Sequence, residues 1–302
     1  MSLRGVGLRA FEQMSKEEGW DRERSFFIAS RSFIAIPFWD RGERTGGFFM
    51  KKQTTYTIYS ASGNPTAVIV GTIPSAKIRA QINVDIMQQS PTVEQCVFVN
   101  PAQKSCCMAG GEMSGNGFRI AGFIVMNAQR TNQLALTDFG SSQSFLCTKE
   151  KSLVSIDLQI PTLLKKTDNE SIYDLGSIVH VVFLAKSKND IKEKETALLE
   201  KYRSLSSNAI GIIGITRSQN NYRIFPKVFV KNINTLVDET SCGSGTVASF
   251  CFINQMSKKL SFIQPTGLPI LAESVRENDT ITRIRISGKI EKISNEISIG
   301  DL

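Results

Sequence analysis

Short apolar runs separated by polar turns make up most of the chain from residue 54 onward. Runs of this length that are rich in Val, Ile, Tyr and Phe are typical of β-strands. Residues 60–65, which read Ser-Ala-Ser-Gly-Asn-Pro, have the composition of a turn between two such strands. The pattern predicts strands over residues 56–59, 67–70, 93–99, 134–137, 145–147, 154–158, 179–184, 210–215 and 281–286.

Helical spacing occurs in three segments. Residues 186–202 are highly charged and carry Ile191 and Leu198 on one side, which predicts an amphipathic helix with a solvated face. Residues 118–126 and 246–253 are mostly apolar, and each follows a glycine-rich turn. The sequence therefore predicts a strand-rich α+β chain.

Composition and charge narrow the class of protein. The chain has 302 residues, a formal net charge of +8 and 41% hydrophobic residues. This length predicts two domains, or one large domain, with a substantial core. No apolar stretch approaches the roughly 18 residues of a transmembrane helix, so we expect no membrane span. The basic residues are scattered and no zinc-finger spacing occurs, which argues against a nucleic-acid partner.

Six cysteines are few for a chain of this length, and two of them, Cys106 and Cys107, are adjacent. This arrangement is not that of a disulfide framework, which predicts a reducing, cytoplasmic location. Since the adjacent pair lies in an apolar run, we expect both residues to be buried in the core.

Residues 1–49 differ from the rest of the chain in their basic residues. They hold seven arginines and one lysine, whereas residues 50–302 hold nine arginines and nineteen lysines. One hypothesis is that Met50 is the true start and that residues 1–49 are a misassigned start. The alternative is a genuine N-terminal extension that docks on the body. Sequencing the N-terminus of protein made from the native gene would separate the two.

A repeated motif carries the candidate chemistry. Residues 114–117 (Ser-Gly-Asn-Gly, the first elbow) and 242–245 (Cys-Gly-Ser-Gly, the second elbow) each place a hydroxyl or a thiol before Gly-x-Gly and a predicted helix. Glycines permit a tight turn, and a helix N-terminus offers unpaired N–H groups to a carboxylate. We expect the helix terminus to lower the pKa of a thiol placed there towards neutrality.

The second elbow has two other interpretations. A single Cys-Gly-x-Gly before a helix is often no more than a tight turn. Residues 243–248 also fit the dinucleotide-binding pattern Gly-x-Gly-x-x-Ala, but that pattern follows a hydrophobic strand, and residues 238–241 are polar. Recurrence of the motif in the other half of the chain favours two facing elbows, which would hold one anionic substrate with a proton-transfer group on each side.

The two elbows resemble those of the diaminopimelate epimerase superfamily, which also includes proline racemases and phenazine-type isomerases. Within it, the chain is most similar to the histidine racemases of staphylopine-type metallophore biosynthesis. The similarity covers most of residues 54–290. Besides the elbows, it rests on residues 62–64 (Ser-Gly-Asn), 94–95 (Glu-Gln), 108–112 (Met-Ala-Gly-Gly-Glu), 178–180 (Ile-Val-His), 239–246 (Glu-Thr-Ser-Cys-Gly-Ser-Gly-Thr) and 264–267 (Gln-Pro-Thr-Gly).

The resemblance implies two pseudo-symmetric β-sheet domains, residues 50–152 and 153–302, each wrapped around a central helix, with the active site in the cleft between them. It also implies cofactor-independent racemisation by two bases, in which one group removes the α-proton and the other returns a proton to the opposite face. The catalytic pair would be Cys242 and Ser114. The α-carboxylate would bind to the backbone amides of Gly115, Asn116, Gly243 and Ser244. Glu112 or Glu239 would bind the amine. Asn64 and His180 would be further substrate-binding residues.

Ser114 departs from the family pattern, which has cysteine at that position. A serine hydroxyl is a much weaker acid than a thiol, and a two-base mechanism works best when both pKa values lie near the operating pH. Three outcomes stay open. Ser114 acts with help from Glu112 or a water in a slower racemase; Cys242 acts alone in a one-base dehydratase or isomerase; or the protein is a catalytically inactive amino-acid-binding homologue.

Histidine is the leading substrate prediction. Diaminopimelate epimerases carry a Glu-Arg pair upstream of the second elbow, and residues 230–234 (Val-Lys-Asn-Ile-Asn) lack it, which disfavours diaminopimelate. His180 is the only histidine and no cluster has metal-ligand spacing, so we expect no metal. The resemblance implies that no cofactor is used. A lone histidine beside a β-run is usually structural, and only the resemblance gives it a site role. The expected partner is an amino-acid substrate, and a homodimer is left open.

Overall fold

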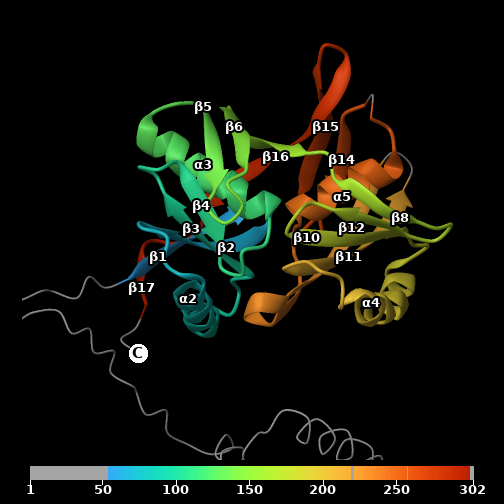
Figure 1. Ribbon diagram of the computed structural model, residues 1–302, viewed down its shortest axis with the longest axis horizontal. Helices are drawn as coiled ribbons and strands as arrows, with labels where there is room; N and C mark the ends of the chain where they lie inside the picture. The colour runs from blue at the N-terminus through green and yellow to red at the C-terminus, as the bar shows by residue number, and fades with distance from the viewer. Residues whose placement is uncertain (1–53, 219–220, 257, 300–302) are drawn as a thin grey trace, which may run out of the picture. The chain divides into compact units, whose positions relative to one another are not determined.

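The computed structural model describes residues 54–218, 221–256 and 258–299. This part of the chain is rich in strands and contains few helices, which confirms the α+β prediction (Figure 1). Each predicted strand overlaps an observed one. The strands are β1 (Thr55–Ala61), β2 (Asn64–Val70), β3 (Gln95–Asn100), β4 (Ser105–Met108), β5 (Gln133–Asp138), β6 (Ser144–Glu150), β7 (Leu153–Gln159), β8 (Thr162–Lys166), β9 (Ser171–Asp174), β10 (Ile178–Leu184), β11 (Ala209–Ser218), β12 (Asn221–Val230), β13 (Thr235–Asp238), β14 (Leu260–Ile263), β15 (Pro269–Glu277), β16 (Thr280–Lys292) and β17 (Ile297–Ser298). The helices are α2 (Ala76–Gln89), α3 (Gly115–Gln129), α4 (Lys188–Tyr202) and α5 (Gly243–Ile253), with a short 3-10 helix, η2 (Lys231–Ile233).

Strands β1 to β7 and β16 form a closed barrel around α3. Each of β1 to β6 pairs with the next along the chain, and β16 closes the ring by pairing with both β7 and β1. The helix contacts all eight strands, and residues 115–122 are buried without a break. A helix that is buried all round is mostly apolar on every face, which explains the mostly apolar pattern that predicted it; Asn116 and Arg119 are the polar exceptions in its buried part.

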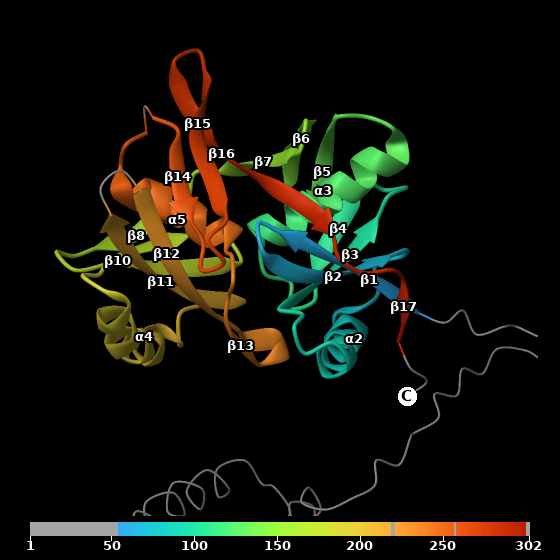
Figure 2. The same cartoon turned by 180° about the vertical axis from the view of Figure 1, so that it is seen from behind.

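Strands β8 to β12 and β14 to β16 form a second sheet, which curves around α5 and stays open. The order runs from β8 through β9, β10, β11, β12, β14 and β15 to β16. α5 contacts β10, β11, β12, β15 and β16. The long strand β16 therefore belongs to both the closed barrel and the open sheet, as Figure 2 shows.

The outer helices cover separate parts of the core. The predicted amphipathic helix is observed as α4, where Ser187 caps the N-terminus and Ile191 is buried against the open sheet. α2 lies over the closed barrel, with Ile86 in a cluster that includes Cys107. The apolar pattern did not predict α2, because its apolar residues do not form one stripe; Ile78 is 52% exposed.

Other expectations from the sequence have mixed outcomes. Cys106 and Cys107 lie in β4 and are fully buried, as predicted. The hypotheses about residues 1–49 fall outside the residues that the structure describes. Within the described ranges, no helix is both long enough and apolar enough to cross a membrane.

Candidate active site

The two elbows bring the N-termini of α3 and α5 into direct backbone contact. α3 begins at Gly115 and α5 at Gly243. A Cβ atom added to Gly115 would lie 2.9 Å from the carbonyl carbon of Gly243, and one added to Gly243 would lie 2.8 Å from the carbonyl carbon of Gly115. Only glycine fits at either position, which is the physical reason for the first glycine of the repeated motif.

Ser114 and Cys242 cap the two helices in the same way. The backbone N–H of Gly117 donates to Ser114 Oγ at 3.0 Å, and that of Gly245 donates to Cys242 Sγ at 3.2 Å. A Cβ atom on Gly117 or Gly245 would crowd these capping atoms, at 3.3 Å from Ser114 Oγ or 3.0 Å from Cys242 Sγ. The repeated motif thus encodes two equivalent N-caps at helix ends that face each other.

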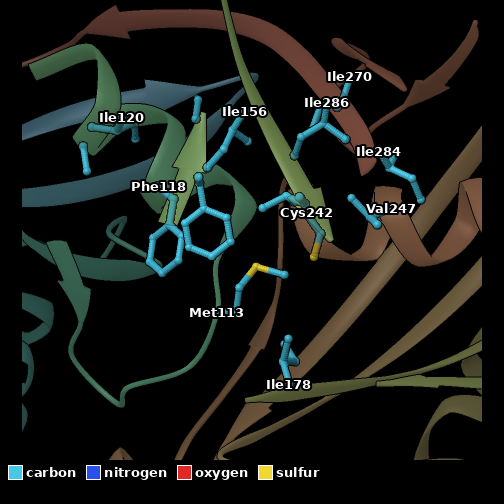
Figure 3. Close-up of a cluster of buried hydrophobic side chains, with 14 of the residues drawn as sticks. Met113, Phe118, Ile120, Ile156, Ile178, Cys242, Val247, Ile270, Ile284 and Ile286 are labelled. Atoms are coloured by element: carbon cyan, nitrogen blue, oxygen red, sulfur yellow. The ribbon is translucent and has the colours of Figure 1, made fainter. Parts of the chain in front are cut away.

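A cavity of about 20 Å³ lies beside the elbows. It has room for roughly one water molecule, so an amino acid can bind only if the walls move apart. Figure 3 shows the Cys242 sulfur directed towards the space beside Met113 and Ile178, which also line the cavity. The other lining residues are Asn83, Glu94, Gln95, Cys96, Glu112, Ser114, Asn116, Val228, Val230, Ile233, Thr235, Val237, Glu239, Gly243 and Ser244.

Most of the site residues expected from the sequence gather at this cavity. Gly115 adjoins it through its contact with Gly243. Asn64 and His180 do not line it: Asn64 lies behind Glu94, and His180 lies behind Ser244. The expected residues that do line it are Glu112, Ser114, Asn116, Glu239, Cys242, Gly243 and Ser244.

His180 reaches the site only through Ser244. Its ring is fully buried, and Nε2 lies 2.9 Å from Ser244 Oγ. Burial lowers the pKa of His180 to about 3, so the ring is neutral at ordinary pH. Gly211 makes room for the ring, since a Cβ atom there would lie 2.1 Å from His180 Nδ1. The ring therefore orients the Ser244 hydroxyl beside Cys242 and carries no charge.

The polar wall of the cavity is acidic. Glu94, Glu112 and Glu239 line it, and its lining includes no lysine or arginine. Burial raises the pKa of Glu94 and of Glu112 to about 7, and it raises that of Glu239 to about 8. Glu112 Oε2 has no hydrogen-bond partner among the described residues. Such a wall favours a ligand that brings a positive charge or hydrogen-bond donors.

The acidic wall should make the ligand-free protein less stable as pH rises. The pKa of Glu112 is raised from 4.5 to about 7, so folding retains a proton that the unfolded chain has already released. This stabilisation is complete below about pH 4.5 and is lost as pH rises through about 7, at up to about 3 kcal/mol for one group. At pH 8 we expect the free energy of unfolding of Glu112→Gln, measured by urea denaturation, to exceed that of the wild type by about 1–3 kcal/mol. At pH 5 the two free energies should be similar.

The matched control for this prediction is Glu200→Gln, which removes an exposed carboxylate on α4. It should show the same fall in stability between pH 5 and pH 8 as the wild type. An equal fall in the Glu112→Gln protein would contradict a raised pKa at Glu112.

A hydrogen-bonded chain that the sequence did not predict lies behind the first elbow. Ser114 Oγ donates to Gln95 Oε1 at 2.9 Å, Gln95 Nε2 donates to Asn64 Oδ1 at 2.7 Å, and Asn64 Nδ2 donates to Glu94 Oε2 at 2.6 Å. The backbone N–H of Thr240 donates to both carboxylate oxygens of Glu94 at 3.1 Å, which ties the chain to the segment before the second elbow. The one signal in the sequence is a polar Glu-Gln pair inside the apolar run of residues 93–99.

This hydrogen-bonded chain keeps Ser114 as a neutral hydroxyl. Because the amide nitrogen of Gln95 donates to Asn64 and Thr66, its oxygen faces Ser114, and the serine must be the donor. An amide oxygen is too weak a base to remove that proton. No hydrogen bond joins Ser114 to Glu112 in the described part of the chain, so the structure does not supply the help from Glu112 that the sequence suggested.

The expectation of a lowered thiol pKa at the second elbow is wrong for this closed form of the site. Burial raises the pKa of Cys242 well above its ordinary value, and the nearby Glu239 raises it further. Hydrogen bonds from Ser244 and from the backbone N–H of Gly245 act in the opposite direction but do not compensate. The stabilisation of a thiolate by the N–H groups of the helix is smaller than its destabilisation by burial, so Cys242 is a neutral thiol here.

The chain is similar to a known protein family and to several solved structures. Residues 54–297 match the family described as "Histidine racemase CntK N-terminal domain". A histidine racemase of Fusobacterium nucleatum subsp. nucleatum is 26% identical over 266 residues, which cover 79% of this chain and 94% of that protein. Two solved structures show a similar fold. A PhzF-family phenazine biosynthesis protein of Enterococcus faecalis has a TM-score of 0.53 at 17% identity, covering 81% of this chain and 98% of that one. A hydroxyproline epimerase of Agrobacterium vitis has a TM-score of 0.54 at 9% identity, covering 83% and 94%.

The fold and the facing helix N-termini, together with these matches, place the protein among the cofactor-independent amino-acid racemases and epimerases, so it is an isomerase. Its family follows from the match over residues 54–297, which spans most of the chain. The chain belongs to the histidine racemase family. The family resemblance stated from the sequence is therefore confirmed.

Among the described residues, no group of three or more His, Cys, Asp or Glu side chains is arranged to hold a metal ion.

Proposed function

We propose that this protein racemises histidine, with Cys242 and Ser114 on opposite sides of the α-carbon. The observation that carries the proposal is the contact between the N-termini of α3 and α5, each capped by one of these two residues. Histidine comes from the name of the matched family and of the relatives from Fusobacterium nucleatum. The acidic wall of the cavity supports it independently.

The proposed binding mode gives each polar part of histidine a complementary surface. The α-carboxylate lies on the backbone N–H groups that begin α3 and α5, which have no partner within their own helices. The ammonium group and the imidazole face Glu112 and Glu239. Diaminopimelate would place a second carboxylate among these acidic side chains, and repulsion disfavours it.

Binding must also open the cavity between the closed barrel and the open sheet. Asn208 Nδ2 donates to the backbone oxygen of Gly111, and Asn232 Nδ2 donates to that of Gly110, each at 2.9 Å. These hydrogen bonds hold the segment before the first elbow against the open sheet. They would break when the walls move apart.

In the proposed reaction, Cys242 as a thiolate takes the α-proton from one face of the substrate. The backbone N–H groups that hold the carboxylate stabilise the negative charge that develops. Ser114 donates its proton to the other face and becomes an alkoxide, which takes a proton from water. The hydroxide formed then removes the proton from the Cys242 thiol and restores the thiolate. The reverse direction needs a serine alkoxide, which is scarce near neutral pH, so we expect the Ser114 step to limit the rate.

One observation favours a second function, which is one-base chemistry. The Ser114 hydrogen is donated to Gln95 Oε1 and is not free for a substrate while that bond holds. If it stays there during the reaction, Cys242 removes and returns the proton on the same face. The enzyme would then be a dehydratase or an isomerase without inversion.

Solvent exchange separates these functions. Purified protein is incubated with L-histidine in D₂O, and the Cα proton is followed by NMR while chirality is read on the same sample. We expect loss of the proton together with formation of D-histidine. Loss of the proton without inversion would support one-base chemistry, and no exchange would rule out histidine as the substrate.

We further propose that the pseudo-symmetric domains 50–152 and 153–302 correspond to the closed barrel and the open sheet. Two strands of the second domain, β7 and β16, complete the barrel by pairing with β6 and β1 of the first. The six cysteines are unpaired, which supports a reducing, cytoplasmic location. The similarity to histidine racemases supports a role in metallophore biosynthesis. A homodimer stays a prediction.

A further inference from the structure

Arg119 is a fully buried cation with no acidic partner among the described residues. It lies on α3, one turn after Gly115 and Asn116, and has no exposed surface. Its Nη2 donates to Asn116 Oδ1 at 2.7 Å and to Ser62 Oγ at 3.4 Å, while Nε and Nη1 have no hydrogen-bond partner within residues 54–218, 221–256 and 258–299. No ion pair joins it to a carboxylate in the described part of the chain. A buried charge in this state destabilises the fold.

The surrounding structure leaves space for the guanidinium. Gly288, on β16, faces it, and a Cβ atom there would lie 2.4 Å from Arg119 Nη1 and 2.2 Å from Ser62 Oγ. Burial lowers the pKa of Arg119 to about 10, so the side chain is still protonated at neutral pH. The interior of the closed barrel therefore keeps a positive charge directly behind the N-terminus of α3.

Arg119 also determines how the two elbows are joined. Because it donates to the oxygen of the Asn116 amide, the amide nitrogen faces the other way and donates to the backbone oxygen of Ser241 at 2.8 Å. Ser241 directly precedes Cys242. Without the arginine, the amide could turn over and present its oxygen to the Ser241 carbonyl, which would repel it.

We propose that Arg119 is a positioning residue that orients Asn116 across the two elbows and supplies the positive charge that attracts an anion to the facing helix N-termini. The substrate carboxylate, and the charge that develops during reaction, would be the counter-ion that Arg119 lacks within the fold. The inference rests on the proposed function only for the identity of that anion.

The test uses full-length protein and two alkylating reagents, so that it does not depend on histidine being the substrate. Iodoacetate and iodoacetamide alkylate the same thiol, and only the first carries a negative charge. The ratio of their rates at Cys242, measured by peptide mass spectrometry, reports the electrostatic potential at the elbows. Cys251, at the other end of α5, serves as an internal control in the same sample.

Arg119→Met should lower the iodoacetate-to-iodoacetamide ratio at Cys242 by about 3- to 30-fold, because a charge at short range acts through a medium of low dielectric constant. The ratio at Cys251 should not change. Arg119→Lys keeps the charge and should restore most of the ratio. The melting temperature of Arg119→Met should equal or exceed that of the wild type, since an uncompensated buried charge has been removed.

A purely structural role predicts the opposite pattern. Arg119→Met would then melt at lower temperature or fail to fold, and the ratio at Cys242 in a folded protein would stay at the wild-type value. Either result overturns the proposal. Arg285→Met gives the contrasting control, because Arg285 forms an ion pair with the buried Asp157 at 2.6 Å. It should lose stability and keep the wild-type ratio at Cys242.

If Arg119→Met and Arg119→Lys change the alkylation ratio at Cys242 as expected, but the wild type forms no D-histidine, the proposed function fails while the role of Arg119 stands.

Discussion

Replacing Cys242 with alanine should lower the rate of Cα-proton exchange by about 10³-fold or more, because a positioned acid–base group typically contributes 10²–10⁴-fold. Both the two-base and the one-base mechanisms assign proton removal to this thiol. Ser114 cannot take over as the base, since its hydroxyl donates to Gln95 and is not acidic enough to ionise near neutral pH. The measurement is proton exchange in D₂O with L-histidine.

Loss of activity in Cys242→Ala must be separated from loss of structure. The substitution removes the N-cap of α5, where the backbone N–H of Gly245 donates to the sulfur, and such a loss typically costs about 1 kcal/mol. The protein should therefore stay folded, with a melting temperature a few degrees lower. Binding of histidine by this variant would show that the carboxylate site at the helix N-termini is intact.

Cys251→Ala is the matched control for Cys242→Ala. Cys251 lies on the same helix but does not line the cavity, and its side chain is half-buried. Exchange at close to the wild-type rate is expected for this variant. If Cys242→Ala also exchanged the proton at that rate, no proposed mechanism would survive.

The elbows were the most predictable part of the molecule. A thiol or hydroxyl, two glycines and an apolar helix are encoded within a few residues, and the close approach of Gly115 and Gly243 leaves no alternative to glycine. The strands were predictable for a similar reason, because buried strands such as β10 and β11 are rich in Val and Ile. In both cases, a pattern within a few consecutive residues predicts the structure of those same residues.

The closure of the barrel and the hydrogen-bonded chain behind Ser114 could not be predicted in this way. Closure depends on pairing between β1 and β16, which lie more than 200 residues apart in sequence. The hydrogen-bonded chain of side chains from Ser114 to Glu94 also depends on strands β2 and β3 lying side by side. The raised pKa of Cys242 had no local signal either, because burial and the position of Glu239 are properties of the folded site.

Replacing Ser114 with cysteine should raise the rate of histidine racemisation by about 10- to 100-fold, since a thiol has a pKa much closer to the operating pH than a hydroxyl. The structure indicates that the larger sulfur atom fits. At the second elbow, Cys242 occupies the equivalent N-cap, and its sulfur accepts from Gly245 at 3.2 Å as Ser114 Oγ accepts from Gly117. Gly117 lacks the side chain that would crowd a sulfur atom there.

Ser114→Ala is the control that assigns the second proton transfer. It keeps Cys242 and removes only the hydroxyl and its two hydrogen bonds, to Gln95 and from Gly117. If Ser114 donates the second proton, Ser114→Ala should still exchange the Cα proton but form D-histidine at least about 10²-fold more slowly. Two results together would contradict this role: a Ser114→Cys protein no faster than the wild type, and a Ser114→Ala protein that still racemises. The proton on that face would then come from another group or from water.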